Sequence, residues 1–225
     1  MTRVQEPTLW GVVFDLDGLL VDSEPLQAES FNKVFAPYGI RLSDNDFEEL
    51  VGIETIDNFR HLRQKFAIDT PLDDLMAHKK EEYHRLVKTR MVPCIGAVEL
   101  VHGIAARGVP LAIASSSPRE DVLLSLDTIG LRSFFPVVVT ADDVATTKPA
   151  PDLYLQACAA INLPPQHCFA FEDSGAGLTT AVAAGLRCFV VPHRYTRTHD
   201  FSAAQAILPT LENITPGELE ALALD

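Results

Sequence analysis

Two aspartates separated by one residue, Asp15 and Asp17, directly follow a short apolar run at residues 9–14. Side chains at positions i and i+2 of an extended chain project to the same side, so both carboxylates can face one reacting centre. An ionised carboxylate can attack phosphorus and form an acyl-phosphate. A neighbouring carboxyl whose pKa is raised by burial and nearby negative charge can protonate the leaving oxygen. The pair therefore suits covalent phosphoryl transfer, and a pair of solvated loop residues is the alternative interpretation.

Further polar groups follow the other apolar runs of the chain, each at the point where the run ends. In chain order they are Ser115, Ser116 and Ser117 after residues 109–114, Lys148 in the loop after residues 136–140, and Glu172 with Asp173 after residues 168–171. Mg²⁺ prefers carboxylate ligands, a lysine neutralises charge on phosphate, and hydroxyls with backbone N–H groups at a helix start bind phosphoryl oxygens. Each group alone has an ordinary interpretation as a helix cap or surface turn. Their occurrence at successive run ends favours a site for a divalent cation and a phosphate.

The elements that must position these groups are one apolar run near the start of the chain and, after residue 93, apolar runs that alternate with helical segments. Runs typical of buried parallel strands lie at residues 9–14, 109–114, 136–140, 168–171 and 188–191. Such alternation predicts right-handed crossovers and a parallel sheet covered on both faces. Ligands of open parallel sheets bind beyond the carboxyl ends of the strands, so the polar groups are expected to converge there.

The stretch from about residue 25 to residue 90 has helical texture and no strand-like run. Ser43 to Asp46 predicts a helix start of the capping-box type, and Pro71 is expected at the first position of a further helix. The predicted fold class is therefore α/β, with a Rossmann-like parallel-sheet core and an inserted all-helical cap domain. The predicted boundaries are 1–21 with 94–225 for the core and 22–93 for the cap.

Composition excludes several classes of function. The chain carries 31 acidic and 18 basic residues, a net charge of -13, which disfavours non-specific binding to nucleic acid or anionic membranes. Residues 1–7 lack the apolar region of a signal peptide, and no apolar run is long enough to span a bilayer. The four cysteines (Cys94, Cys158, Cys168 and Cys188) form no CxxC pair and are interpreted as reduced, buried thiols. We expect a cytoplasmic monomer or weak homodimer whose partner is a small phosphorylated molecule.

Four segments resemble, in order, the motifs of the haloacid dehalogenase (HAD) superfamily, and within it the β-phosphoglucomutase-like or CbbY-like phosphatase branch with a helical cap. They are residues 14–24, 114–117, 147–152 and 171–177. The resemblance covers nearly the whole chain and implies the split α/β core described above. It also implies a cap that closes over the core and excludes water, as enzyme lids do.

The resemblance assigns a role to each candidate residue. It implies Asp15 as the nucleophile and Asp17 as the general acid and base. Mg²⁺ would be held by the Asp15 carboxylate, the Asp17 backbone carbonyl and Asp173, with Glu172 as a ligand or as a partner of one. Phosphate would be held by Ser115, Lys148 and the backbone N–H of Ser116.

The choice of reaction depends on smaller differences. Dehalogenases of the superfamily need neither an acid two residues after the nucleophile nor a metal, so Asp17 and Asp173 favour phosphoryl transfer. Resemblance to the mutases would imply a histidine, a Lys-Gly pair and a nearby arginine. At the matching positions this chain has Gln27, Val51–Gly52 and Thr55. A phosphatase is therefore preferred over a hexose-phosphate mutase. A phosphate-binding protein without turnover is the third hypothesis, disfavoured because no essential group is missing.

Substrate specificity is expected to depend on residues outside the four motifs. Gln27 and the cap residues Val51, Gly52, Ile53 and Glu54 are expected to approach the substrate, and the alternative for 51–54 is a helix-to-helix turn packed on the cap itself. His193 to Tyr195, after the last predicted strand, is interpreted as a solvated loop rather than as part of the site.

Overall fold

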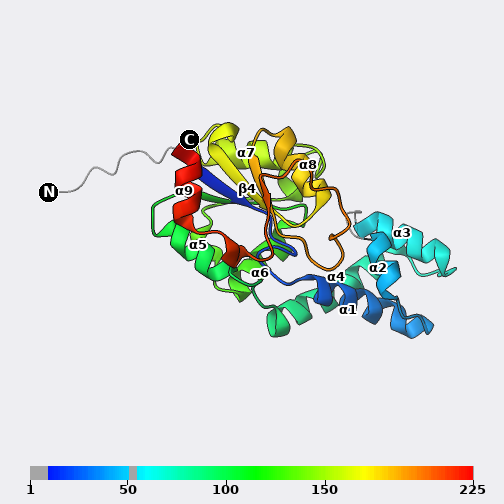
Figure 1. Cartoon of the computed structure of the whole chain (residues 1–225). Helices are drawn as coiled ribbons and strands as arrows, with labels where there is room; N and C mark the ends of the chain where they lie inside the picture. Colours follow the sequence, from blue (N-terminus) through cyan, green and yellow to red (C-terminus); the bar gives the residue numbers. More distant parts are fainter. Residues whose placement is uncertain (1–9, 51–54, 225) are drawn as a thin grey trace. The chain divides into compact units, whose positions relative to one another are not determined.

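The computed structural model describes residues 10–50 and 55–224 and divides into two compact units (Figure 1). The first holds the described residues of Met1–Val21 and Pro93–Asp225, and the second those of Asp22–Val92. Pro93 was expected in the insert, but it forms an antiparallel bridge with Val21 of the first unit. Among the described residues, no helix combines the length and the apolar character that crossing a membrane requires.

The first unit is built on a six-stranded parallel sheet with strand order β3-β2-β1-β4-β5-β6. The strands are β1 (Gly11–Phe14), β2 (Leu111–Ala114), β3 (Val137–Val139), β4 (Cys168–Glu172), β5 (Arg187–Val190) and β6 (Ala206–Ile207). This confirms the predicted parallel α/β fold. The strand β6 was not predicted, because its two partly or fully exposed residues are too few to show a pattern.

Strand register decides which residues meet at the carboxyl edge of the sheet. Phe14, the last residue of β1, pairs with Ile113 of β2 on one side and with Phe171 of β4 on the other. The backbone N–H of Asp15 donates to the Phe171 carbonyl at 3.0 Å, which continues this pairing one residue beyond β1. Asp15 and Glu172 are therefore neighbours at one edge of the sheet.

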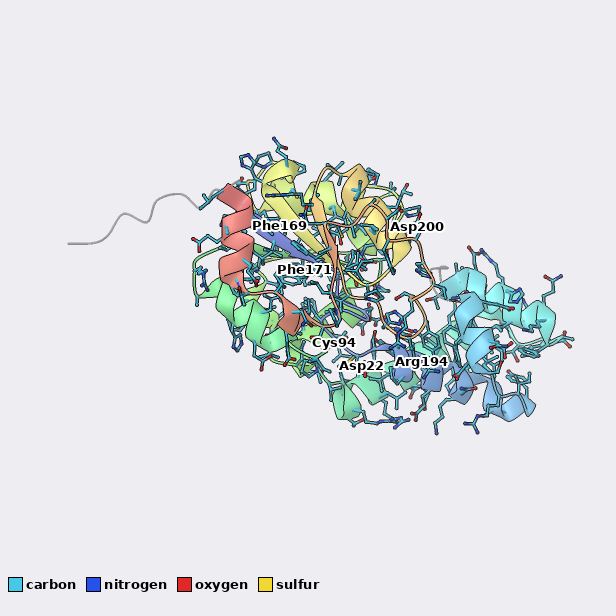
Figure 2. All side chains as sticks on the ribbon, viewed as in Figure 1. Asp22, Cys94, Phe169, Phe171, Arg194 and Asp200 are labelled. Carbon is cyan, nitrogen blue, oxygen red and sulfur yellow. The ribbon has the colours of Figure 1, made fainter. Side chains whose placement is uncertain are left out.

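Both faces of the sheet are buried, as expected for parallel strands. The α-helices of this unit are α5 (Ala97–Ala105), α6 (Arg119–Thr128), α7 (Asp152–Ala160), α8 (Gly175–Ala183) and α9 (Pro216–Leu224). The helices α7 and α8 pack on one face, over small strand residues such as Val13 and Ala170 (Figure 1). The other face carries a stack of aromatic rings, in which the ring centroid of Phe171 lies 5.1 Å from that of Phe14 and 5.2 Å from that of Phe189. Phe171 and its neighbour Phe169 on β4 are labelled in Figure 2.

Short 3₁₀ helices complete the connections. They are η1 (Ala36–Tyr38) in the second unit, and η2 (Arg132–Phe134), η3 (Ala141–Asp143), η4 (Pro165–His167) and η5 (Leu211–Asn213) in the first.

In its described residues the second unit is entirely helical, as predicted. Its α-helices are α1 (Glu24–Phe35), α2 (Asp44–Leu50), α3 (Thr55–Lys65) and α4 (Leu72–Arg90). The ring of Phe59 on α3 stacks on Phe31 of α1 at 5.0 Å between centroids, which joins these helices through a buried aromatic core.

The two predicted helix starts of this unit differ in outcome. Ser43 and Asp46 form the predicted capping box, with the Ser43 N–H donating to Asp46 Oδ2 at 2.7 Å and the Asp46 N–H to Ser43 Oγ at 3.3 Å. The placement of Pro71 inside α4 was wrong by one position. Its ψ of 142° is extended, so Pro71 is the N-cap residue and the helix begins at Leu72.

Candidate active site

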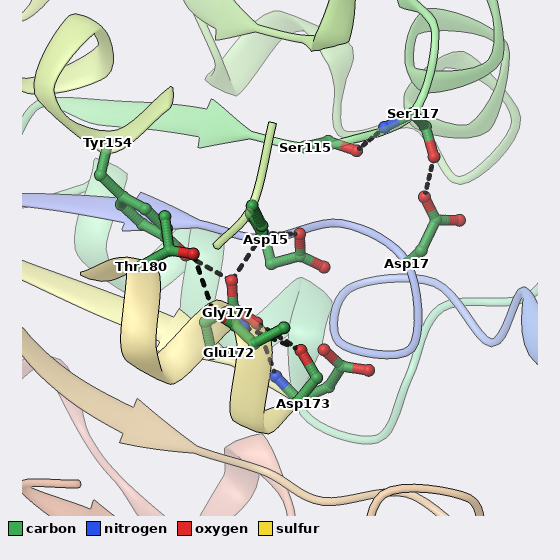
Figure 3. Close-up of polar contacts among 12 residues, drawn as sticks. Asp15, Asp17, Ser115, Ser117, Tyr154, Glu172, Asp173, Gly177 and Thr180 are labelled. Carbon is green, nitrogen blue, oxygen red and sulfur yellow. Dashed lines mark hydrogen bonds and ion pairs between the residues drawn. The ribbon is translucent and has the colours of Figure 1, made fainter. Parts of the chain in front are cut away.

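Three buried carboxylates meet where β1 and β4 end. Asp15 follows β1, Glu172 ends β4 and Asp173 comes next in the chain, and each of these side chains is buried. One oxygen from each lies within 4.8 Å of the other two (Figure 3). Carboxylates at this spacing can share one hard divalent cation, so the donor set fits the predicted Mg²⁺. The cluster holds three of the residues that sequence reasoning selected.

Lys148 enters this cluster from the loop between η3 and α7. Its ammonium contacts Asp15 Oδ1 and lies 2.6 Å from Glu172 Oε1, with only 9% of the side chain exposed. Burial lowers the pKa of Lys148, but the attraction of Asp15 and Glu172 outweighs burial and raises it. Lys148 therefore stays charged and partly neutralises the carboxylates, and its role in phosphate binding stays a prediction.

The charge at this edge remains unbalanced, with three carboxylates against one lysine. Burial raises the pKa of Asp15 well above its usual range, Lys148 opposes this, and the repulsion of Glu172 and Asp173 raises the pKa further. Burial also raises the pKa of Glu172, against the lowering effect of Lys148. Full ionisation of the cluster is therefore costly until further positive charge arrives. A divalent cation supplies that charge, which is a second reason why these residues fit one.

Glu172 is held from several sides. Tyr154 of α7 donates from its hydroxyl to Glu172 Oε1 at 2.7 Å, and the Asp173 N–H donates to Oε2 at 3.2 Å. A Cβ at Gly177 of α8 would come within 1.9 Å of the Glu172 carboxyl, so only glycine leaves room for this carboxylate. Sequence reasoning assigned no role to Tyr154, because one aromatic residue on an amphipathic helix carries no signal beyond burial.

Asp17 lies in the tight turn after β1, in which Gly18 adopts a φ of +75° and its N–H donates to the Val21 carbonyl at 2.9 Å. Within the described residues its carboxylate is not part of the three-carboxylate cluster, and it accepts a hydrogen bond of 2.7 Å from Ser117 Oγ (Figure 3). The general-acid candidate is thus joined to the serine loop. Sequence reasoning noted Ser117 only as one of three serines.

The serine loop follows β2 and has one buried and one exposed candidate. Ser115 is 1% exposed, and its Oγ accepts a hydrogen bond of 3.1 Å from the Ser117 N–H. Because that oxygen is the acceptor, the Ser115 hydroxyl proton is available for another partner. Ser116 is exposed. Both lie one strand away from Asp15, because β2 is the direct neighbour of β1.

His193 corrects the prediction of a solvated loop after the last strand. Its Nε2 lies 2.9 Å from Asp173 Oδ2, and only 16% of its side chain is exposed. Arg194 is exposed, as expected for a loop residue. The position of His193 just after β5 fits the rule that ligands of parallel sheets bind beyond the carboxyl ends of the strands. The polar composition of residues 193–195 favoured a solvated loop, and only the contact with Asp173 places His193 at the site.

Comparison with known proteins identifies the family of the chain. Residues 12–191 match the haloacid dehalogenase-like hydrolase family. The chain belongs to this family. It is 36% identical to the protein CbbY of Rhodobacter capsulatus, over 90% of this chain and 94% of the relative. It is 32% identical to validoxylamine A 7'-phosphate phosphatase of Streptomyces hygroscopicus subsp. limoneus, over 90% and 93%.

Among solved structures, a mutant CbbY from Rhodobacter sphaeroides in complex with xylulose-(1,5)bisphosphate superposes on this hydrolase with a TM-score of 0.82. The two are 27% identical, and the match covers 91% of this chain and 95% of the other. These relationships confirm the resemblance to the CbbY-like branch. They make the chain a HAD-family phosphohydrolase.

The residues proposed for specificity in this HAD hydrolase stay predictions. Gln27 lies on α1 and is partly buried, and its carbonyl accepts a hydrogen bond of 2.7 Å from Ser30 Oγ. Val51, Gly52, Ile53 and Glu54 lie outside the described residues.

Proposed function

We propose that the chain is a Mg²⁺-dependent phosphatase that hydrolyses a small phosphorylated sugar through an aspartyl-phosphate on Asp15. The observation that carries the proposal is the meeting of Asp15, Lys148, Glu172 and Asp173 at the carboxyl edge of the sheet. Two kinds of similarity support the sugar class. Two relatives are named as phosphatases of a phosphorylated carbohydrate or a close analogue, and one similar structure contains a sugar bisphosphate.

The proposed cation ligands are Asp15, Asp173 and Glu172, with the Asp17 backbone carbonyl as a further ligand. When bound, Mg²⁺ would offset the repulsion between the nucleophile and the phosphate. The close approach of the three carboxylates and the raised pKa of two of them support this assignment.

The first chemical step belongs to the two aspartates. An oxygen of Asp15 forms a bond to phosphorus while the bond from phosphorus to the sugar oxygen breaks, and Asp17 gives its proton to that oxygen. In the second step Asp17 takes a proton from water, the water oxygen bonds to phosphorus, and the bond to Asp15 breaks. Phosphate leaves and both aspartates return to their starting states.

The phosphoryl group would be held from two sides. Lys148 carries a fixed positive charge beside Asp15, and the Ser115 hydroxyl has a proton free to donate. The Ser116 N–H is proposed as the third donor, in a loop that leads into α6.

The test is release of inorganic phosphate from a panel of sugar monophosphates and bisphosphates, with and without Mg²⁺. We expect turnover that EDTA abolishes and that Asp15→Asn lowers by about 10³-fold or more, since the nucleophile is lost. Asp127→Asn is the matched control, because Asp127 is exposed near the far end of α6. Mass spectrometry of the acid-quenched enzyme should locate the phosphoryl group on the peptide that contains Asp15.

Two outcomes would contradict the proposal. Interconversion of hexose phosphate isomers that needs a bisphosphate activator, with little phosphate released, would favour the mutase. Binding of phosphorylated sugars without any turnover would favour a binding protein.

A further inference from the structure

The segment after β5 lies against the end of β4. The Val191 N–H donates to the Glu172 carbonyl at 2.8 Å, which carries the parallel pairing to the last residue of β4. Two residues later, His193 Nε2 lies 2.9 Å from Asp173 Oδ2, and these side chains are 16% and 10% exposed. A largely buried imidazole thus lies against a carboxylate that the proposed function assigns to the cation.

One hydrogen bond to the His193 ring indicates which of its nitrogens carries the proton in the neutral imidazole. The Tyr195 N–H donates to His193 Nδ1 at 3.3 Å. A neutral imidazole whose Nδ1 accepts has its proton on Nε2, the nitrogen beside Asp173. A protonated Nε2 has no lone pair to offer a metal ion. His193 is therefore suited to contact a ligand of the cation and unsuited to be a ligand itself.

The backbone holds the imidazole in this place. The His193 N–H donates to Thr196 Oγ1 at 3.1 Å, and the Thr196 N–H donates to the His193 carbonyl at 3.1 Å. Six residues further on, His199 Nδ1 accepts a hydrogen bond of 3.1 Å from the Gly175 N–H at the start of α8. The segment is thus attached to Asp173 and to Gly175, on either side of Ser174.

The turn after β1 packs against this pair. A Cβ at Gly18 would lie 2.7 Å from Asp173 Oδ2 and 2.9 Å from His193 Cδ2. These atoms therefore pack directly against the backbone of the turn that carries Asp17. Asp173 Oδ2 has the Gly18 backbone and His193 Nε2 as close neighbours, which restricts rotation of its carboxylate.

We propose that His193 is a positioning residue, which orients the Asp173 carboxylate for the divalent cation. The inference rests on the proposed function for the role of Asp173, and it adds a residue from the loop after β5 to the groups that follow β1, β2 and β4. Partners that orient a metal ligand typically change metal affinity by about 10–100-fold when removed. A role in packing alone would lower stability and leave the affinity of the folded protein unchanged.

The experiment measures cation binding without any substrate. Mn²⁺ is titrated into the full chain, and free Mn²⁺ is quantified by electron paramagnetic resonance for wild type, His193→Ala, His193→Gln and His167→Ala. His167 is the matched control, because it is exposed and precedes the first residue of β4, at the opposite end of the sheet. Circular dichroism identifies the variants that fold.

We expect His193→Ala to raise the Mn²⁺ dissociation constant about 10–100-fold and His167→Ala to leave it unchanged. Glutamine keeps an N–H donor on a side chain of similar reach, so the dissociation constant of His193→Gln should lie between those of His193→Ala and wild type. If the alanine variant does not fold, the comparison of His193→Gln with wild type is the test. If wild type binds Mn²⁺ and a folded His193 variant binds it with the same dissociation constant, the role of His193 is overturned and the proposed cation site stands. Failure of wild type to bind Mn²⁺ would overturn the proposed cation site and this inference with it.

Discussion

Ser117 Oγ donates a hydrogen bond of 2.7 Å to Asp17 Oδ2, joining the loops after β2 and β1 across 100 residues of sequence. Because Asp17 is the proposed acid and base, its orientation should affect the rates of both chemical steps. Asp17 is ionised when it takes the proton from water in the second step, and a hydrogen bond to a charged group contributes about 1.5–3 kcal/mol. We therefore predict that Ser117→Ala lowers kcat about tenfold or more and changes KM little. Steady-state phosphate release under saturating Mg²⁺ measures this.

Ser133→Ala provides the control for the serine substitution, because Ser133 is exposed in η2 and distant in sequence from every candidate residue. It should retain the kcat of wild type. A Ser117→Ala enzyme with wild-type kcat would show that Asp17 needs no partner from the serine loop.

The convergence of the site could be predicted because each group follows a strand. In a parallel sheet all carboxyl ends lie at one edge, so Asp15, Lys148 and Glu172 had to meet near that edge once the strands were identified. What the sequence could not supply is the register. The pairing of Phe14 with Phe171 places Asp15 beside Glu172, and a different register would separate them.

Other residues of the site carry no usable pattern. Tyr154 occupies a buried helical position of the kind that any large apolar residue can fill, and only its hydroxyl contact with Glu172 marks it. His193 lies in a loop whose path depends on tertiary contacts with Asp173 and Gly18. The composition of that loop, with its charged and hydroxyl residues, is typical of a solvated segment.

Tyr154 offers a test of how far Glu172 depends on its neighbours. Its hydroxyl is the donor to Oε1 of a carboxylate that is 0% exposed. Tyr154→Phe removes that donor and leaves a buried acceptor with one partner fewer. We predict a loss of about 1–3 kcal/mol in the free energy of unfolding, measured by urea denaturation.

Tyr38→Phe is the matched control for this change. The Tyr38 hydroxyl also has a hydrogen-bonding partner, Thr70 Oγ1 at 2.6 Å, but Tyr38 is 41% exposed. Water can replace the partner there, so the substitution should cost less than about 0.5 kcal/mol. Equal losses for both tyrosines would mean that burial of Glu172 is not the cause.

Gly177 should tolerate no side chain. A Cβ there would lie 1.9 Å from the Glu172 carboxyl, far inside van der Waals contact. Gly177→Ala must therefore displace either Glu172 or the start of α8, and we predict a loss of stability of about 1–3 kcal/mol together with weakened Mn²⁺ binding. Gly217→Ala is the control, because its nearest neighbour would be Arg107 at 3.9 Å. Because alanine favours helices, Gly217→Ala should be neutral or slightly stabilising. Normal Mn²⁺ affinity in Gly177→Ala would contradict the close packing of Glu172 on α8.

Asp46 makes the stability of the helical unit depend on pH. Hydrogen bonds from Lys65 and from Ser43 lower the pKa of Asp46 from 3.8 to about 2. Ionised Asp46 therefore stabilises the folded unit fully above pH 3.8, and this contribution is lost as pH falls through about 2. We predict that Asp46→Asn lowers the free energy of unfolding by about 1 kcal/mol at neutral pH, a value reduced by solvent screening. The difference between variant and wild type should shrink between pH 3.8 and about 2.

Lys65→Met completes a double-mutant cycle for this pair, whose atoms are 2.7 Å apart. Because Lys65 is a main cause of the low pKa, the cost of Asp46→Asn should be smaller and less dependent on pH when Lys65 is absent. High salt should have the same effect on the wild-type pair, since exposed ion pairs are screened. A cost of Asp46→Asn that stays constant from neutral pH to about 2 would instead assign the whole effect to packing of the capping box, because packing does not titrate.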